Sequence, residues 1–221
     1  RGEPVQDTAR VLSRYLDCIM IRTFDQQEVE DMAEYGSIPV INGLTDYCHP
    51  CQVLADLMTI KEYKGELEGL KLCFVGSGNN MANSLIVGGI KTCMSVSIAC
   101  PSGYEPDEDI VKWGKANGNL QLTQDCLEAA KGADVLCTDV WASMGQEKEL
   151  AQRNGSLKEY QINDSVMAVA KSDAIVQHCL PAHREEEITA KVFEEHAGEI
   201  FDEAENRLHV HKAILVKCLT D

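Results

Sequence analysis

Residues 72–99, LCFVGSGNNMANSLIVGGIKTCMSVSIA, contain the pattern that decides the fold. An apolar run at 72–75 is followed by a glycine-rich turn, a longer segment at 79–90 and a second apolar run at 96–99. Short apolar runs bounded by turns predict buried strands, and the longer segment between them predicts a helix. A helix that joins two buried strands is typical of a parallel sheet with both faces covered. This stretch therefore predicts an α/β fold.

The same alternation continues on both sides of this stretch. Toward the C-terminus we expect helices at 107–116, 127–131, 164–170 and 186–195, strands at 120–122, 135–138, 174–176 and 200–201, and a last helix from 206. Toward the N-terminus we expect helices at 7–16, 26–35 and 49–63 and strands at 18–24 and 38–41. Charged residues cluster with Gly65 and Gly69 at 61–71, which predicts a boundary between two parallel-sheet α/β domains.

The two predicted domains are unequal. The second has about six strands, whereas the first has two, which are too few for a sheet covered on both faces. The chain also begins at Arg1 rather than Met. We therefore expect the first domain to be truncated, with a segment missing before residue 1.

Composition excludes several classes of protein. Apolar residues make up 44% of the chain and charged residues 25%, which is typical of a globular protein. A net charge of −16 argues against a general binder of nucleic acid or of anionic membranes, although a small anion in a local basic pocket remains compatible with it. Ten cysteines without a secretory signal predict reduced thiols in the cytoplasm.

Polar groups follow six of the apolar runs. They are Arg22-Thr23, Asn42-Gly43, residues 76–80, Asp139, residues 178–181 and residues 203–207. Ligands of parallel sheets bind beyond the carboxyl ends of the strands. These turns therefore predict a site at one edge of the sheet.

Neither a dinucleotide nor a metal is expected at this edge. In the turn at 76–80 the third glycine of a dinucleotide motif would fall at Met81, and no acidic residue stands at 100–102 after the next strand. The turn is either a tight entry into a helix or a place where Asn amides meet a carboxylate or amide ligand. Cys48 and Cys51 form a C-x2-C pair, but Pro50 interrupts it and no second pair has finger spacing.

Six pieces of the chain together resemble the ornithine carbamoyltransferases. They are MIRTF at 20–24, HPCQ at 49–52, GNN at 78–80, DVWASMGQ at 139–146, HCLP at 178–181 and EAENR at 203–207. The HPxQ motif alone would indicate the wider carbamoyltransferase superfamily. The SMG, HCLP and AENR pieces resemble the ornithine branch.

The resemblance implies an organisation in two domains. Residues 1–64 would be a partial carbamoyl-phosphate domain with a linking helix, 65–205 the ornithine domain, and 206–221 a helix that returns to the first domain. The family's Ser-Thr-Arg-Thr phosphate-binding motif does not occur in this sequence. Ser77 stands where the family usually has Asp, and Glu185 where Gly is common.

The resemblance also implies roles for individual residues. Arg22, His49 and Gln52 would bind the carbamoyl group, Arg207 would contact the same substrate, and Pro50 and Cys51 of the same motif would contact substrate. Asn80, Asp139, Ser143 and Met144 would hold the amino-acid end of ornithine. Cys179, with the backbone of Leu180, would lie beside the δ-amine as an orienting group, although a buried inert cysteine is the alternative.

The expected function is carbamoyl transfer from carbamoyl phosphate to the δ-amine of L-ornithine, which gives citrulline and phosphate in arginine metabolism. The alternatives are a carbamoyltransferase for another amine, such as putrescine, and an inactive binding fragment without the phosphate motif. No metal or organic cofactor is implied. The family resemblance implies a homotrimer or a multiple of trimers, and no nucleic-acid or membrane partner is expected.

Overall fold

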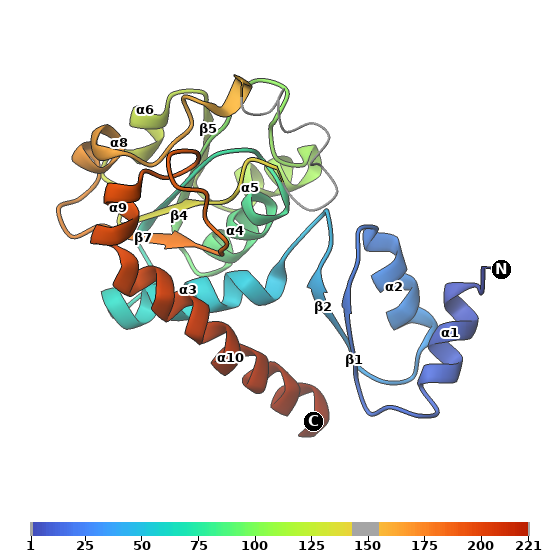
Figure 1. Ribbon diagram of the computed structural model, residues 1–221. Helices are drawn as coiled ribbons and strands as arrows, with labels where there is room; N and C mark the ends of the chain where they lie inside the picture. Colours follow the sequence, from blue (N-terminus) through green and yellow to red (C-terminus); the bar gives the residue numbers. More distant parts are fainter. Residues whose placement is uncertain (1, 143–154, 221) are drawn as a thin grey trace.

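Two parallel sheets of unequal size form the framework of the computed structural model, which describes residues 2–142 and 155–220 (Figure 1). The smaller part contains α1 (Val5–Leu12), β1 (Ile19–Arg22), α2 (Gln26–Tyr35) and β2 (Val40–Leu44), and α3 (Pro50–Lys64) leads from it to the larger part. The larger part contains β3 (Lys71–Val75), α4 (Asn80–Lys91), β4 (Ser95–Ala99), α5 (Glu108–Asn117), β5 (Leu120–Thr123), α6 (Cys126–Ala130), β6 (Val135–Thr138), α8 (Asp164–Val169), β7 (Ile175–His178), α9 (Ala190–Glu195) and α10 (Ala197–Thr220). The predicted α/β class is confirmed.

The smaller part is a two-stranded parallel sheet with helices on one face. Strands β1 and β2 pair from Ile19 opposite Val40. Ala9 of α1 and Met32 of α2 pack with Ile19 to form the core of this part. The predicted pair of strands in the first half is therefore present.

The larger part is a five-stranded parallel sheet with the order β5-β4-β3-β6-β7. One apolar core lies on the face covered by α3, α4 and α5, with residues such as Ile60, Leu85 and Phe74 fully buried. A second core lies on the other face, against α6, α8 and α9, around residues such as Leu136 and Phe193. Both faces are covered, as the apolar strands predicted.

The predicted strand at 200–201 is wrong. Ile200 and Phe201 belong to α10, which begins at Ala197 and not at residue 206, so the larger sheet has five described strands instead of six. The buried side chains of α10 include Ile200, Glu203 and Asn206, a helical spacing of three. Because two of these three are polar, the apolar pattern did not reveal the helix. The expected domain boundary after residue 205 lies inside α10.

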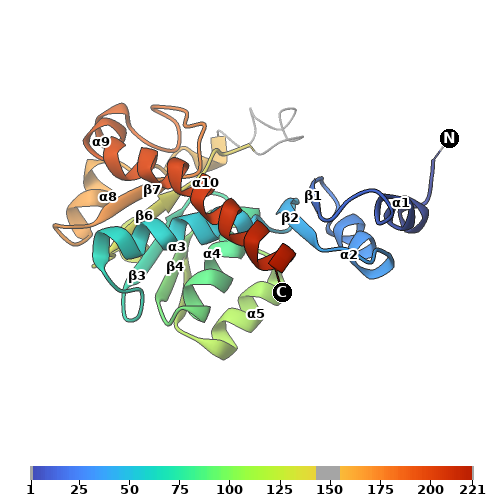
Figure 2. The same cartoon turned by 90° about the horizontal axis from the view of Figure 1, so that it is seen from below.

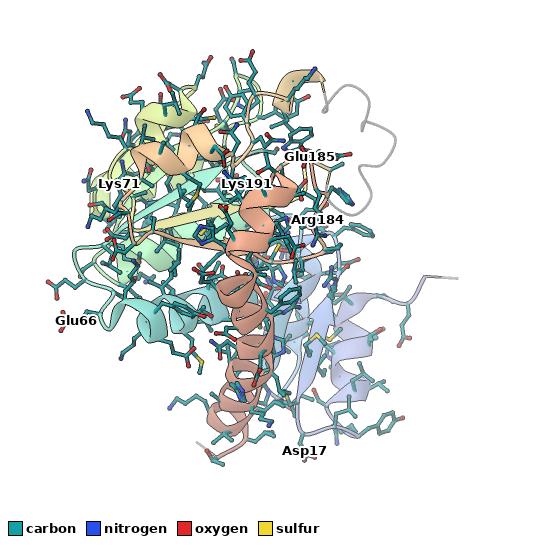
Figure 3. The ribbon with its side chains drawn as sticks, turned by 60° about the vertical axis from the view of Figure 1, so that its left-hand side comes forward. Asp17, Glu66, Lys71, Arg184, Glu185 and Lys191 are labelled. Atoms are coloured by element: carbon teal, nitrogen blue, oxygen red, sulfur yellow. The ribbon has the colours of Figure 1, made fainter. Side chains whose placement is uncertain are left out.

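The helix predicted from residue 186 begins later, at Ala190. The residues before it form a turn in which Glu185 adopts a left-handed backbone with φ of +68°. The Glu185 carboxylate accepts a hydrogen bond of 2.9 Å from the Ala190 amide, which stabilises the start of α9. Figure 3 shows Glu185 near Arg184, on the side of the larger part away from Glu66 and Lys71.

Helices α3 and α10 run side by side, and α3 links the two parts (Figures 1 and 2). Asn206 of α10 donates hydrogen bonds to Thr59 and Glu62 of α3, at 2.9 and 2.6 Å. The loop from α3 to β3 contains Gly65 and Gly69, both with left-handed backbone, at the expected domain boundary. None of the helices in the described ranges has the length and apolar character needed to cross a membrane.

Candidate active site

A cavity of about 330 Å³ lies where the smaller part meets the carboxyl edge of the larger sheet. Seven of the expected site residues line it, namely Arg22, His49, Asn80, Asp139, Cys179, Leu180 and Arg207. They come from β1, the start of α3, the start of α4, the ends of β6 and β7, and α10. Segments far apart in the sequence thus converge on one cavity, as the turns at the strand ends predicted.

The other expected residues lie elsewhere. Pro50 lines a separate apolar pocket between α3 and α4, and Cys51 lines a neighbouring cavity of about 260 Å³. Gln52 is fully buried beneath the site. Ser143 and Met144 lie outside the described residues. Pro50 and Cys51 face away because residues one and two positions after His49 point to other sides of a helix.

Positive charge gathers on the side of the cavity formed by β1 and α10. Arg22 at the end of β1 and Arg207 of α10 both line it, in a chain whose net charge is −16. Burial, and then the charges of Arg207 and Arg22, lower the pKa of His49 to about 4. His49 is therefore a neutral imidazole at pH 7, and its one N–H is bonded to the backbone of Gly43. Its Nδ1 atom has no hydrogen-bond partner within residues 2–142 and 155–220.

Backbone contacts fix the position of His49 at the start of α3. The His49 amide donates to the Ser84 hydroxyl at 2.8 Å, and Ser84 in turn donates to the Asn80 carbonyl at 2.7 Å. The side-chain amide of Asn80 donates to the Thr45 carbonyl at 2.7 Å. The first turn of α4 therefore holds the loop between β2 and α3, and with it His49.

Asp139 is a buried carboxylate at the end of β6, with 7% of its surface exposed. Its Oδ1 atom accepts from the Val140 amide at 2.8 Å and from the Cys179 thiol at 3.1 Å. Its Oδ2 atom accepts from the side-chain amide of Asn79 at 2.7 Å. The Asn79 oxygen caps α4 by accepting from two backbone amides, so the amide group of Asn79 has one favourable orientation.

Cys179 is a protonated thiol. Burial, and then the Asp139 carboxylate that accepts its S–H, hold the pKa of Cys179 well above the ordinary value. A reactive cysteine needs the thiolate form, which positive neighbours favour and a carboxylate disfavours. The environment of Cys179 thus suits an orienting group better than a nucleophile.

The turn after β7 is held by His178. Its Nε2 atom lies 2.9 Å from the Glu187 carboxylate, and its Nδ1 atom accepts from the Leu180 amide at 2.9 Å. Leu180 has a left-handed backbone with φ of +55° and precedes a cis peptide bond to Pro181. The Leu180 N–H is occupied, so its carbonyl is the backbone group that remains to bind a substrate.

Gln52 has a defined orientation. Its Nε2 atom donates to Asp56 at 2.8 Å and to Glu203 at 2.9 Å, which uses both N–H bonds. Its carbonyl oxygen is buried without a partner among the described residues. With both N–H bonds used, Gln52 can only accept a hydrogen bond from a further group.

Close packing explains the glycine-rich turn after β3. A Cβ atom on Gly78 would lie 2.2 Å from the Pro106 nitrogen, and the Gly78 amide donates to the Tyr104 carbonyl at 2.7 Å. The glycine thus lets the turn approach the loop after β4. This supports the interpretation as a tight entry into a helix.

Sequence reasoning missed several lining residues. They are Leu44, Asp46, Met81, Val140, Ala142, Pro181 and His183. Most stand within three positions of a residue that was expected, so proximity to a strand end was the available signal.

His183 is also part of a group with Glu186 and Glu187, whose possible metal-ligand atoms lie within 4.8 Å of one another. Glu187 already accepts hydrogen bonds from His178 and from the His183 amide.

Comparisons with known proteins cover both parts of the chain. The family model for the aspartate/ornithine carbamoyltransferase carbamoyl-P binding domain matches residues 1–62, and the model for the Asp/Orn binding domain matches residues 68–218. These matches do not support the expectation that the first domain is truncated.

Individual relatives agree with these models. The ornithine carbamoyltransferase of Carboxydothermus hydrogenoformans is 55% identical over 99% of this chain and 72% of its own length. That of Geobacter metallireducens is 53% identical over 99% of this chain and 73% of its own length. The structure of ornithine carbamoyltransferase from Pyrococcus furiosus superimposes with a TM-score of 0.91 at 50% identity, covering 98% of this chain and 71% of that one.

Proposed function

The chain belongs to the aspartate/ornithine carbamoyltransferase family, and from this premise we propose that it transfers the carbamoyl group of carbamoyl phosphate to the δ-amine of ornithine. The products are citrulline and phosphate. The composition of one cavity carries the proposal. Arg22 and Arg207 supply positive charge for an anionic donor, and Asp139 with Cys179 supplies a buried carboxylate and a thiol for a cationic acceptor.

Carbamoyl phosphate is bound on the arginine side. Guanidinium groups form strong, charge-assisted hydrogen bonds with phosphate oxygens. The neutral His49, whose ring N–H is bonded to the Gly43 backbone, lies beside the carbamoyl group. The charges of Arg22 and Arg207 stabilise the carbamoyl oxygen, where negative charge develops when the amine attacks. Gln52 lies three positions after His49, on the same side of α3, and its unpartnered oxygen accepts a hydrogen bond from the carbamoyl NH2 group.

Ornithine is bound on the Asp139 side. The Asp139 carboxylate pairs with the α-ammonium group, and Asn80 contacts the α-carboxylate. The δ-amine has an ordinary pKa of about 10.4, so the neutral form that attacks is scarce at pH 7. Transfer into the cavity removes water from the ammonium form and raises the neutral fraction. The Leu180 carbonyl and the Cys179 sulfur direct the amine toward the carbamoyl carbon.

The reaction needs no bond between the protein and the carbamoyl group. The amine nitrogen attacks the carbamoyl carbon, the bond from that carbon to the phosphate oxygen breaks, and phosphate leaves with the electron pair. The amine loses one proton, which the departing phosphate can take up. The protonated state of Cys179 supports direct attack.

The test compares ornithine with putrescine as acceptors at equal concentrations of carbamoyl phosphate. We expect citrulline to form with a much higher kcat/KM than carbamoylputrescine, because putrescine lacks the α-ammonium and α-carboxylate groups. Equal values would favour the alternative of a transferase for simple amines. No product with either amine would contradict a carbamoyltransferase.

We also propose that the chain forms homotrimers, or multiples of trimers, in a reducing compartment such as the cytoplasm. All ten cysteines are free, which supports the compartment. Large apolar side chains stay exposed on β1 and on the last turns of α10, including Met20 at 65% and Val216 at 60%. Such side chains support a contact with a further subunit. Light scattering coupled to size exclusion measures the oligomeric state.

A further inference from the structure

Two acidic side chains are buried together beneath the cavity, between α3 and α10. Asp56 of α3 is 2% exposed and Glu203 of α10 is 1% exposed. Their carboxyl groups lie close together, because the single Nε2 atom of Gln52 is within 2.9 Å of an oxygen of each. We refer to Asp56 and Glu203 as the carboxyl pair. No step of the proposed reaction uses it.

The carboxyl pair holds two parts of the site. Gln52 donates one N–H to Asp56 Oδ1 at 2.8 Å and the other to Glu203 Oε1 at 2.9 Å. The backbone amide of His178 donates to Glu203 Oε2 at 2.8 Å. Glu203 therefore connects Gln52 to the turn that carries Cys179.

Two buried carboxyl groups that share one donor nitrogen favour a proton on one of them. Burial raises the pKa of Asp56 to about 7 and that of Glu203 well above its ordinary value, and contact with Asp56 raises the latter further. Two ionised carboxylates in contact would repel each other at a site with little water. At neutral pH the pair therefore carries one proton and one negative charge, and its titration belongs to both residues together.

Other ionisable groups face the carboxyl pair. Arg207 of α10 lowers the pKa of both acids, and Asp139 at the end of β6 raises the pKa of Asp56. The thiols of Cys137 and Cys179 also face it, and burial together with nearby carboxyl groups keeps both thiols protonated. Arg207 thus supplies the positive charge that keeps the pair from holding two protons at neutral pH.

We propose that Asp56 and Glu203 share one proton and act as positioning residues for the carbamoyl donor. The singly protonated pair accepts both N–H bonds of Gln52, so that the Gln52 oxygen is left for the carbamoyl NH2 group. If the carboxyl pair took up a second proton, the new O–H group would need an acceptor. The Gln52 oxygen is the nearby acceptor without a partner among the described residues. The amide of Gln52 would then turn over and stop accepting from the donor. This inference rests on the proposed function.

The shared proton predicts different effects for two matched substitutions. In Asp56→Asn, the Asn oxygen accepts from Gln52 and its NH2 group donates to an ionised Glu203, so one negative charge and the bonds to Gln52 and His178 remain. In Glu203→Gln, an NH2 group must face either Gln52 or His178, and one of these donors loses its acceptor. Asp202→Asn, an exposed change on the same helix, is the control.

The first measurement is the affinity for carbamoyl phosphate as a function of pH, by calorimetry. In the unsubstituted protein we expect the Kd to rise as the pH falls below about 7, well above the pH at which His49 titrates. Asp56→Asn should keep the Kd at about pH 8 and lose this rise. Glu203→Gln should raise the Kd by about 10-fold or more at every pH, because a buried donor is left unpaired. Asp202→Asn should follow the unsubstituted profile.

The second measurement is infrared spectroscopy of the free protein at about pH 8. We expect the carbonyl band of a protonated carboxyl group, which Asp56→Asn and Glu203→Gln each remove and Asp202→Asn keeps. Three results would each overturn the inference. They are absence of the band, equal effects of the two substitutions on binding, and a Kd of Asp56→Asn that still rises as the pH falls below about 7. Failure of the unsubstituted protein to bind carbamoyl phosphate would overturn the proposed function together with the positioning role. Normal binding without the band would overturn the inference alone.

Discussion

Replacing Asp139 by Asn removes a buried negative charge from the cavity while keeping the shape of the side chain. The Asn oxygen is expected to keep the hydrogen bonds from the Val140 amide and the Cys179 thiol. The new NH2 group then faces the NH2 group of Asn79, which now donates to Asp139 at 2.7 Å. Asn79 cannot turn over without losing its cap on α4. One hydrogen bond to a charged group is therefore lost within the protein.

The larger effect is expected on ornithine. Removal of one partner from a desolvated charge pair costs about 2–5 kcal/mol. We take the lower end, about 2 kcal/mol, because the cavity is open to water before the substrate binds. This corresponds to an increase of about 30-fold or more in the Kd of ornithine. Carbamoyl phosphate is anionic, so loss of a nearby negative charge should leave its affinity unchanged or slightly higher.

The assay measures the KM and Kd of both substrates for Asp139→Asn and for Asp46→Asn. Asp46 is an exposed carboxylate at the same cavity, and the same charge change there should raise the ornithine Kd by no more than about 5-fold. Thermal unfolding of each variant separates a loss of stability from a loss of affinity. Equal losses for the two substrates in Asp139→Asn would refute the pairing of Asp139 with the α-ammonium group.

Three further predictions concern a thiol, a glycine and a buried acid. Cys179→Ser should retain measurable turnover, since a hydroxyl can still donate to Asp139. Mass spectrometry of the unsubstituted protein during turnover should find no carbamoyl group on Cys179. A carbamoylated cysteine that forms and decays at the turnover rate would refute direct attack. Gly78→Ala should lower the free energy of unfolding by about 1–3 kcal/mol, because the new Cβ meets the backbone at Pro106. Gly155→Ala should change the melting temperature little, because no atom of the described residues lies within 4 Å of its new Cβ. Because the pKa of Asp56 is raised to about 7 from an unfolded value of about 3.9, the native state binds more protons between these values, and stability should fall as the pH rises through that window. Asp56→Asn should reduce this fall in urea titrations, and an unchanged pH dependence would contradict the shift.

Much of the fold was predictable because the local signals agree with the tertiary structure. The strand Val135–Thr138 is apolar and fully buried, and the helix Gln26–Tyr35 begins after a capping Asp25. Both were predicted with the observed bounds. Ile200 and Phe201 show where this reasoning fails, because an apolar pair can belong to a strand or to a helix. The buried Glu203, three positions after Ile200, shows that this segment is a helix, and the sequence does not reveal that Glu203 is buried.

The location of the candidate site was predictable, whereas the orientation of its side chains was not. Strand ends and motif spacing identified the residues that meet at the cavity. The direction of the Gln52 amide could not be predicted, because it depends on Asp56 and on Glu203, which is 151 positions away in the sequence. The orientation of the Asn79 amide could not be predicted either, because its partner Asp139 is 60 positions away in the sequence. Side-chain orientation depends on such long-range partners, which a local pattern does not contain.

The most direct test of the account follows the carbamoyl group itself. The protein is incubated with isotopically labelled carbamoyl phosphate, with and without ornithine, and citrulline and phosphate are quantified by mass spectrometry and a colorimetric assay. We predict labelled citrulline in an amount equal to the phosphate released, with both products dependent on ornithine. Phosphate release that is independent of ornithine, without labelled citrulline, would contradict carbamoyl transfer at this cavity.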